Sequence, residues 1–463
     1  MRRLIPALSS ALVALSLGAQ AAPRPVIVAR LDSLSRDFLV SAPAAGATVA
    51  VIKGSDTLLF SGFGEQDRER HVAADRATVY RIGSITKQFT SSAIMQLVQD
   101  GRLRLTDRLG TLLPEYGAWK DVTVRQLLNH TSGIHSYTAS RAWAPRMADP
   151  LTPAEVMGFV ASDTLDFASG TSYRYNNSGY FLLGMILEKM ERKPYAQIVR
   201  DRFFMPMGMR SATYCPNVPT DAHFADGYDK QGPVLAPTQR LDLSSPFSAG
   251  ALCMSVPDYL TWQTALTSGR IVTPATYALM TTSDTIASGL RTGYGFGLAS
   301  GMLGTHRLVQ HGGDINGFST AQFWFPDDSL RVVVFTNTLG SIPDRLAMNL
   351  SRATLGMPVV VPPKLPPLVP LAAADRAKYE GTYDLMRPGN PTVLPLRVWI
   401  EGDALVSQAP NQNKIPLRYL GNDTFGVDFD PAVRLTFTLE SGKGLKVRLL
   451  QGGGSIEGLR QQP

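Results

Sequence analysis

The sequence predicts an α/β protein of the α+β kind, in which an antiparallel sheet flanked by helices carries a helical lobe and is followed by a small antiparallel β-barrel. Three observations predict this architecture. Strand-like stretches lie at both ends of a long first region, amphipathic stretches fill its middle, and a proline-rich segment separates it from a last region of short strands. We therefore expect one sheet whose first and last strands are neighbours, with a functional site in the cleft beside the helical lobe.

The first region opens with a predicted β-hairpin, because residues 48–52 and 57–60 are strand-like and flank a polar turn. Its middle is mostly helical, with amphipathic stretches at 124–128, 153–160 and 180–190. Alternating or β-branched runs predict closing strands at 307–310, 319–325 and 330–336.

The N-terminal segment has the three parts of a secretory signal peptide. Met1-Arg2-Arg3 is basic, the run that ends at Leu17 is apolar, and Ala19-Gln20-Ala21 resembles a cleavage site. A membrane anchor is the alternative, but the apolar run is shorter than a bilayer span. We expect cleavage after Ala21 or Ala22 and an exported protein, periplasmic or secreted, with no membrane span in the mature chain.

A proline-rich segment divides the rest of the chain. Six prolines between Met357 and Pro370 indicate a semi-rigid linker, because proline fits neither a helix interior nor a central strand. The short strands after it are separated by turns rich in Gly, Asn and Asp, which predicts the small barrel. The expected organisation is a signal peptide at 1–21, a main domain at 22–356, the linker at 357–374 and the barrel at 375–463.

Charge and cysteine content narrow the function classes. The formal net charge is +7, but Lys and Arg are scattered, so we expect no binding of nucleic acid. The two cysteines, Cys215 and Cys253, are too few for a disulfide framework. Export allows them to pair, whereas the apolar run 251–254 suits a buried free thiol, so the sequence leaves the bond undecided.

Ser84 and Lys87 form the first chemical motif. They follow Tyr80-Arg81-Ile82-Gly83 and precede a predicted helix, in which apolar residues recur at helical spacing from Phe89 to Val98. Residues three apart share a helix face, so a neutral Lys87 amine can accept the Ser84 proton and later return it. One Ser-x-x-Lys match arises readily by chance, so its partners decide whether it is functional.

Two further motifs supply candidate partners. Tyr175 and Asn177 lie in a turn before an apolar helix, where the phenol could shuttle a proton and the amide could hold a carbonyl. The alternative is a turn with a packed tyrosine. His311-Gly312-Gly313 follows a predicted strand, and its open backbone suits a substrate added at the strand edge or an oxyanion. The alternative is a glycine turn with an exposed histidine.

Together the three motifs resemble the signature of the serine β-lactamase and penicillin-binding-protein superfamily, where Ser-x-x-Lys, Tyr-x-Asn and Lys-Thr-Gly or a variant occur in this order. The resemblance spans about residues 27–355. Stretches that resemble class C-like relatives reinforce it, at 127–133, 206–209, 248–252 and 294–297. The region after Tyr379 resembles the lipocalin-like barrels that some members carry.

The resemblance implies a role for each motif residue. Ser84 is expected to attack the substrate carbonyl and become acylated, while Lys87 and Tyr175 share the proton transfer. Asn177 is expected to hold the substrate amide. The backbone N–H groups of Ser84 and Asp314 are expected to form the oxyanion hole, and water then hydrolyses the acyl-enzyme.

The third motif departs from the common pattern, because His311 stands in place of Lys and Gly312 in place of Thr. Histidine is only partly charged at neutral pH, so strong recognition of a penicillin carboxylate is not expected. His-x-Gly variants resemble the D-aminopeptidase, D-peptidase and esterase members. No cofactor or metal is expected, since His130 and His135 lie in a loop without matching carboxylates.

The expected protein is an exported serine hydrolase that forms an acyl-serine intermediate on small peptide-like amides or esters. D-amino-acid peptides or peptidoglycan fragments are the leading candidate substrates. A carboxylesterase or weak β-lactamase is the alternative within the enzymes, and a non-catalytic protein that binds cell-wall peptides is the alternative outside them. The sequence leaves open the preferred side chain, the role of the barrel and the oligomeric state.

Overall fold

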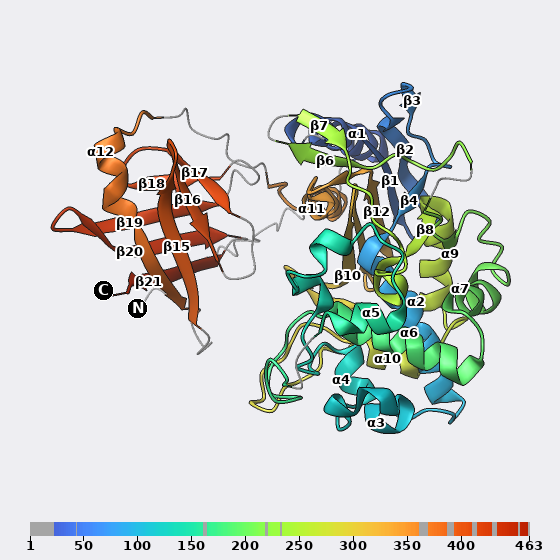
Figure 1. Ribbon diagram of the computed structural model, residues 1–463. Coiled ribbons are helices and arrows are strands. Elements are labelled where there is room, and N and C mark those ends of the chain that lie inside the picture. The colour runs from blue at the N-terminus through green and yellow to red at the C-terminus, as the bar shows by residue number, and fades with distance from the viewer. Residues whose placement is uncertain are drawn as a thin grey trace, which may run out of the picture. The chain divides into compact units, whose positions relative to one another are not determined.

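The computed structural model describes residues 23–42, 44–160, 164–217, 221–231, 234–360, 369–386, 393–409, 414–427, 433–451 and 454–461 (Figure 1). The chain divides into two compact units. The first comprises Met1–Ile134, Ala148–Pro153 and Asp163–Val359, and the second comprises His135–Met147, Ala154–Ser162 and Val360–Pro463. The expected signal peptide and the central part of the expected linker lie outside the described residues.

An antiparallel sheet forms the centre of the first unit. Within the described ranges it has seven strands, in the spatial order β3 (Val72–Ala73), β2 (Asp56–Asp67), β1 (Gly46–Lys53), β12 (Leu330–Thr336), β11 (Phe318–Phe325), β10 (His306–Ile315) and β9 (Ala299–Leu303). The predicted hairpin is confirmed as β1 and β2. β1 also pairs with β12, so the first and last long strands are neighbours, as the sequence predicts.

One face of this sheet packs against α1 (Arg24–Ser41) and α11 (Pro343–Thr354). Val49 and Val51 of β1 alternate along the strand and point into this layer, where they share a core with Leu346 and Leu350 of α11. Because α11 places its apolar residues four apart, they form one stripe that faces the sheet. This layer covers the face of the sheet that points away from the helical lobe.

The opposite face packs against the helical lobe. The ring of Phe335 on β12 lies 6.1 Å from that of Tyr80 and 5.5 Å from that of Tyr259, and Phe89 stacks on Trp262 at 3.9 Å. The helices of this unit include α2 (Thr86–Gln99), α3 (Leu109–Leu112), α4 (Val124–Leu128), α6 (Asn177–Glu191), α7 (Tyr195–Val199), α8 (Phe247–Gly250), α9 (Val256–Thr267) and α10 (Pro274–Thr281).

The predicted helical stretches are confirmed as α4, α5 (Pro153–Gly158) and α6. α6 begins three residues earlier than its apolar pattern, because the side chain of Asn176 accepts a hydrogen bond from the Gly179 N–H at 2.8 Å and caps the helix. This cap places Asn177 at the first position of the helix.

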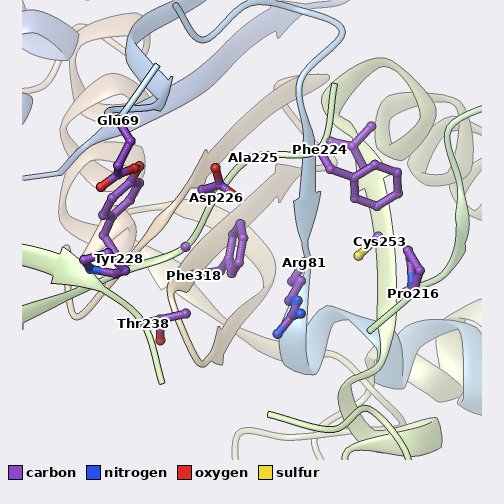
Figure 2. A pocket seen from close by; sticks show the side chains of 13 residues that line it. Glu69, Arg81, Pro216, Phe224, Ala225, Asp226, Tyr228, Thr238, Cys253 and Phe318 are labelled. Atoms are coloured by element: carbon purple, nitrogen blue, oxygen red, sulfur yellow. The ribbon is translucent and has the colours of Figure 1, made fainter. Parts of the chain in front are cut away.

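Two small sheets complete the first unit. One contains β4 (Val79–Arg81), β8 (Leu252–Ser255) and β5 (Thr213–Tyr214), and the other contains β13 (Thr338–Leu339), β6 (Tyr228–Gln231) and β7 (Val234–Pro237). Residues of both sheets line a pocket beside Phe318, which begins β11 (Figure 2). β4 leads directly into the segment that carries Ser84.

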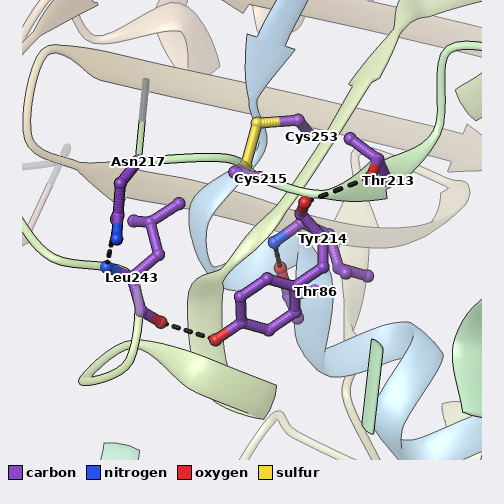
Figure 3. Close-up of a disulfide and its surroundings, with 8 residues drawn as sticks. Thr86, Thr213, Tyr214, Cys215, Asn217, Leu243 and Cys253 are labelled. Carbon is purple, nitrogen blue, oxygen red and sulfur yellow. Dashed lines mark hydrogen bonds between the residues drawn. A yellow bond between two sulfur atoms is a disulfide. The ribbon is translucent and has the colours of Figure 1, made fainter. Parts of the chain in front are cut away.

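A disulfide joins Cys215 to Cys253 beside the β5–β8 pair (Figure 3). The two Cα atoms are 5.1 Å apart, and both residues are buried. Next to it, the Tyr214 hydroxyl donates a hydrogen bond to the Leu243 carbonyl at 2.6 Å. The structure thus answers the question that the sequence left open, in favour of the bond.

The second unit contains the predicted barrel, which is closed and antiparallel. The described residues give it eight strands: β14 (Gly381–Met386), β15 (Val393–Glu401), β16 (Ala404–Gln408), β17 (Ile415–Tyr419), β18 (Thr424–Gly426), β19 (Arg434–Glu440), β20 (Lys443–Gln451) and β21 (Gly454–Arg460). The short helix α12 (Ala373–Arg376) precedes them. Tyr379, Tyr383 and Phe437 are buried in its core. No helix among the described residues is both long and apolar enough to cross a bilayer.

We predict that the variant Cys253→Ser lowers the free energy of unfolding by about 2–4 kcal/mol, because the bond closes a loop that the unfolded chain otherwise samples freely. Thermal unfolding with and without reductant measures this. Reductant should lower the melting temperature of the parent protein but not that of the variant. An equal response of both proteins would contradict a structural bond.

Candidate active site

Ser84 and Lys87 lie at the start of α2, next to strand β10. Ser84 belongs to a 3₁₀ turn, Gly83–Ile85, and its Oγ lies 3.1 Å from Lys87 Nζ. Gly83 has a φ of +50°, a left-handed conformation that glycine adopts without strain. A Cβ at Gly83 would lie 3.0 Å from the backbone nitrogen of Asp314, so this turn holds Ser84 close to the third motif.

Lys87 is completely buried, and three oxygen atoms surround its amine. Nζ lies 2.8 Å from Asn177 Oδ1 and 2.8 Å from the Ala249 carbonyl, in addition to Ser84 Oγ. No carboxylate lies within 4.0 Å of it in the described part of the chain, and burial lowers the pKa of Lys87 well below 10.5. A neutral amine donates two hydrogen bonds, and here Asn177 Oδ1 and the Ala249 carbonyl oxygen accept them. Its lone pair then faces the Ser84 hydroxyl.

Tyr175 lies over the same amine, with its ring centroid 4.8 Å from Lys87 Nζ. Although 38 % of the residue surface is exposed, packed atoms surround its hydroxyl group. Burial raises the pKa of Tyr175 well above 10.0, and a hydrogen bond with the Ser84 side chain opposes this shift. The phenol therefore keeps its proton at neutral pH. It can donate or relay a proton, whereas Lys87 is the group able to accept one.

Asn177 contacts the Lys87 amine of this network, and His130 contacts the Tyr175 ring. Because Asn177 Oδ1 binds Lys87, a substrate carbonyl can only be held by the NH₂ group of Asn177. The buried His130 accepts a hydrogen bond at Nδ1 from the backbone N–H of Asn176 at 3.1 Å, and its ring lies 4.3 Å from that of Tyr175. Burial, together with the nearby Lys87, lowers the pKa of His130 well below 6.5. His130 is thus a neutral packing partner of Tyr175.

His311 is buried on β10 and is neutral, which differs from the partly charged state expected from the sequence. Its Nδ1 lies 2.5 Å from the Gly312 carbonyl, which can only accept, so Nδ1 carries the hydrogen. Nε2 then accepts a hydrogen bond from the Tyr294 hydroxyl at 2.8 Å. Burial, with a contribution from Lys87, lowers the pKa of His311 to about 4. This residue therefore supplies no positive charge for a carboxylate.

The two glycines after His311 have different surroundings. A Cβ on Gly313 would lie 2.0 Å from the Ile82 carbonyl oxygen and 2.6 Å from Thr320 Oγ1, so only glycine fits there. A Cβ on Gly312 would meet no atom closer than 3.3 Å. Gly313 thus permits β10 to approach the segment that carries Ser84, while a Cβ on Gly312 makes a tight contact that a small shift of the Thr320 carbonyl relieves.

The backbone beyond His311 has an open edge. β9 pairs with β10 only from His306 to Gln310, so an extended ligand can add to the edge of residues 311–315. Beside this edge, burial raises the pKa of Asp314, and burial together with Asp314 raises the pKa of Asp344 to about 6. Ser319 Oγ donates to Asp314 Oδ1 at 2.5 Å. Two carboxyl groups with raised pKa values therefore lie beside the third motif, and Lys87 is the base near them.

A family model described as Beta-lactamase matches residues 31–356. The chain belongs to the beta-lactamase family.

Individual relatives agree with this assignment. The chain is 26 % identical over 310 residues to "Putative penicillin-binding protein PbpX" of Bacillus subtilis, covering 66 % of this chain and 75 % of that protein. It spans 47 % to 75 % of the length of curated relatives of this kind.

Solved structures of beta-lactamase relatives cover most of the chain. An octameric penicillin-binding protein homologue from Pyrococcus abyssi is 26 % identical, with a TM-score of 0.67 over 93 % of this chain and 99 % of that one. A D-stereospecific amidohydrolase from Streptomyces sp. is also 26 % identical, with a TM-score of 0.62 over 71 % of this chain and 99 % of that one. The first comparison extends over the barrel as well as the main domain.

The sequence motifs therefore meet in one place, and the structure adds three groups that they did not assign. Ala249 contributes a backbone carbonyl, which has no sequence signature. Tyr294 stands in a stretch that resembles the family but had no role. The sequence raised His130 and His135 together as a possible metal pair. In the structure the His130 ring packs against Tyr175, and His135 belongs to the second unit. Contacts over long sequence separations define all three roles.

We predict that kcat/KM for a neutral ester rises with pH along a limb that lies well below pH 10.5. Lys87 must lose its proton to act as a base, and burial lowers its pKa. His311 should contribute no step near pH 6.5, because its pKa of about 4 leaves it neutral there. A pH–rate profile from pH 4 to 10 measures this. A limb near pH 6.5 that vanishes in His311→Gln would contradict the neutral histidine.

The two glycines provide a matched pair of variants. Gly313→Ala should lower the free energy of unfolding by about 1–3 kcal/mol and reduce activity strongly, because its Cβ collides with Ile82 and displaces β10 from Ser84. Gly312→Ala should lower the melting temperature much less, because its Cβ only makes a tight contact with the Thr320 carbonyl oxygen at 3.3 Å. Thermal unfolding and ester hydrolysis of both variants test this, and equal losses in the two would refute the steric distinction.

Proposed function

We propose that this protein is a serine hydrolase that forms an acyl-enzyme on Ser84, with Lys87 as general base and Tyr175 as proton relay. One observation carries the proposal. The Lys87 amine has two obligate acceptors for its hydrogens, and its third neighbour is the Ser84 hydroxyl at 3.1 Å. This arrangement directs the nitrogen lone pair at the proton that must leave during attack.

The proposed reaction proceeds through two balanced steps. Lys87 takes the Ser84 proton as Oγ attacks the substrate carbonyl, and the backbone N–H groups of Ser84 and Asp314 stabilise the oxyanion. The leaving amine or alcohol receives the proton, by way of Tyr175. Water then attacks the acyl-serine, gives one proton back to Ser84 through the same groups, and releases the acid.

The proposed substrates are small amides or esters of D-amino acids and related peptides, including peptidoglycan fragments. The name of the D-stereospecific amidohydrolase supports this class. The charges support it too, because His311 is neutral and Asp314 and Asp344 are acidic, which disfavours a substrate carboxylate near the third motif. The same charges make a penicillin-type substrate the weaker candidate.

We also propose that the protein is exported. The N-terminal sequence supports this, and the Cys215–Cys253 disulfide adds a second reason, since such bonds persist in oxidising compartments outside the cytosol. A carboxylesterase remains the alternative activity, because the chemistry at Ser84 is the same for esters.

We predict that a fluorophosphonate probe labels the full chain once and that Ser84→Ala abolishes both labelling and turnover, with a loss of roughly a thousandfold or more. Ser92→Ala is the matched control, because this serine lies buried on the same helix and its hydroxyl has no hydrogen-bond partner among the described residues. Mass spectrometry and activity assays measure both effects. Labelling that persists in Ser84→Ala would refute the nucleophile, and a parent protein without label would favour the non-catalytic peptide-binding alternative.

A substrate panel separates the remaining activities. We expect D-alanine p-nitroanilide and p-nitrophenyl esters to be hydrolysed faster than nitrocefin, which carries a carboxylate. Turnover of esters alone would favour the carboxylesterase. Equal rates on the D- and L-alanine anilides would contradict the D-specific proposal.

A further inference from the structure

Asp344 places a carboxyl group beside the third motif that has no part in the proposed proton transfer. The residue belongs to the first turn of α11. Its Oδ2 and Oδ1 atoms lie 3.5 Å and 3.6 Å from the position that a Cβ on Gly312 would take. Because Gly312 has no side chain, this residue does not screen the carboxyl group from a ligand at the edge of β10. The position of Asp344 therefore bears on which substrates this edge accepts.

The charge of Asp344 is not balanced by a cation. In the described part of the chain neither Asp344 nor Asp314 forms an ion pair, and both residues are exposed to solvent. Packed atoms nevertheless surround the carboxyl group of Asp344, and this burial together with Asp314 raises its pKa to about 6. Asp344 is thus mostly ionised at neutral pH. Its counter-charge has to come from the solvent or from a ligand.

Strand geometry directs one side chain of an added ligand toward Asp344. β9 pairs with β10 only as far as Gln310, so the edge of residues 311–315 is open to an extended ligand. Residues that lie opposite each other on paired strands point their side chains to the same face of the sheet. A ligand residue opposite Gly312 therefore points its side chain to the face on which Asp344 lies, and Asp314 follows on that face two residues later.

The proposed function identifies this part of the ligand as the leaving group, and the inference rests on it in this respect. The proposed oxyanion donors are the backbone N–H groups of Ser84 and Asp314. Tyr175, which is proposed to pass a proton to the leaving group, has its ring 6.1 Å from that of His311. The leaving group therefore extends from the oxyanion donors along His311 and Gly312, where it meets Asp344.

We propose that Asp344 is a specificity-determining residue that selects substrates whose leaving group carries a positive charge. This class comprises peptides with a basic side chain after the scissile bond, amides of diamines and esters of amino alcohols. A leaving group with a carboxylate is disfavoured, because it meets two carboxyl groups and no cation. An acid in the first turn of a helix can instead serve only the helix dipole. That role predicts a change in stability with no change in the order of substrates.

The test compares three thioesters of acetic acid that differ in the leaving group. Acetylthiocholine is cationic, S-(3,3-dimethylbutyl) thioacetate is its neutral isostere, and S-acetyl-3-mercaptopropionate is anionic. We expect kcat/KM of the full-length protein to be at least about threefold higher for the cation than for the neutral isostere, and lowest for the anion. The ratio should fall toward one in Asp344→Asn, and the order should reverse in Asp344→Lys. Asp327→Asn, in the turn between β11 and β12, removes the same charge elsewhere and should leave the ratio unchanged.

Binding to the Ser84→Ala variant separates this proposal from the proposed hydrolysis. Isothermal titration should give the same order of affinities for the three thioesters, and Asp344→Asn in that background should remove it. If the parent hydrolyses none of them while this order holds, the hydrolysis fails and the role of Asp344 stands. Equal values for the cation and its isostere in both assays would overturn the proposal. So would a ratio that Asp344→Asn leaves unchanged, and a lowered melting temperature as the sole effect would assign Asp344 to the helix dipole.

Discussion

The proposed chemistry of this protein depends on the Lys87 amine, which is buried and has no counter-ion in the described part of the chain. Burial removes water from Lys87, and the three oxygen atoms around it come from the turn before α2, from α6 and from α8. Close packing of these segments requires glycine. A Cβ on Gly184 of α6 would lie 2.0 Å from Ser248 Oγ, and one on Gly297 would lie 2.7 Å from the Lys87 carbonyl. Two residues without side chains thus allow the fold to enclose the amine, and enclosure lowers its pKa.

The same burial leaves the neighbouring titratable groups uncharged. His130 and His311 have lowered pKa values and Tyr175 has a raised one, so at neutral pH hydrogen bonds orient the groups around Ser84. Such a set of fixed dipoles needs little rearrangement when charge develops on a substrate. The carboxyl groups of Asp314 and Asp344 lie at the side of the third motif. Reactivity and charge selectivity are therefore set by different residues.

The sequence predicts the parts of this structure that local rules govern. The spacing of Ser84 and Lys87 follows from helix geometry, and strand patterns give the β1–β2 hairpin and its neighbour β12. It could not predict the protonation of His311, which depends on the Tyr294 hydroxyl 17 residues earlier. Nor could it choose between a disulfide and a free thiol at Cys215, or find the Ala249 carbonyl. These features arise from tertiary packing, which leaves no periodic signal.

The third motif shows how such a departure from the family pattern can change specificity and spare catalysis. Gly313 is fixed by the Ile82 carbonyl, so the approach of β10 to Ser84 does not depend on the residues at 311 and 312. The proposed oxyanion donor at Asp314 is a backbone N–H, and the acceptors around Lys87 lie on other elements. Replacing a lysine by a neutral histidine and a threonine by Gly312 therefore removes a cation and a hydroxyl from the substrate side of the strand. The proposed proton-transfer network loses nothing by these replacements, so the motif is consistent with a hydrolase of altered substrate preference.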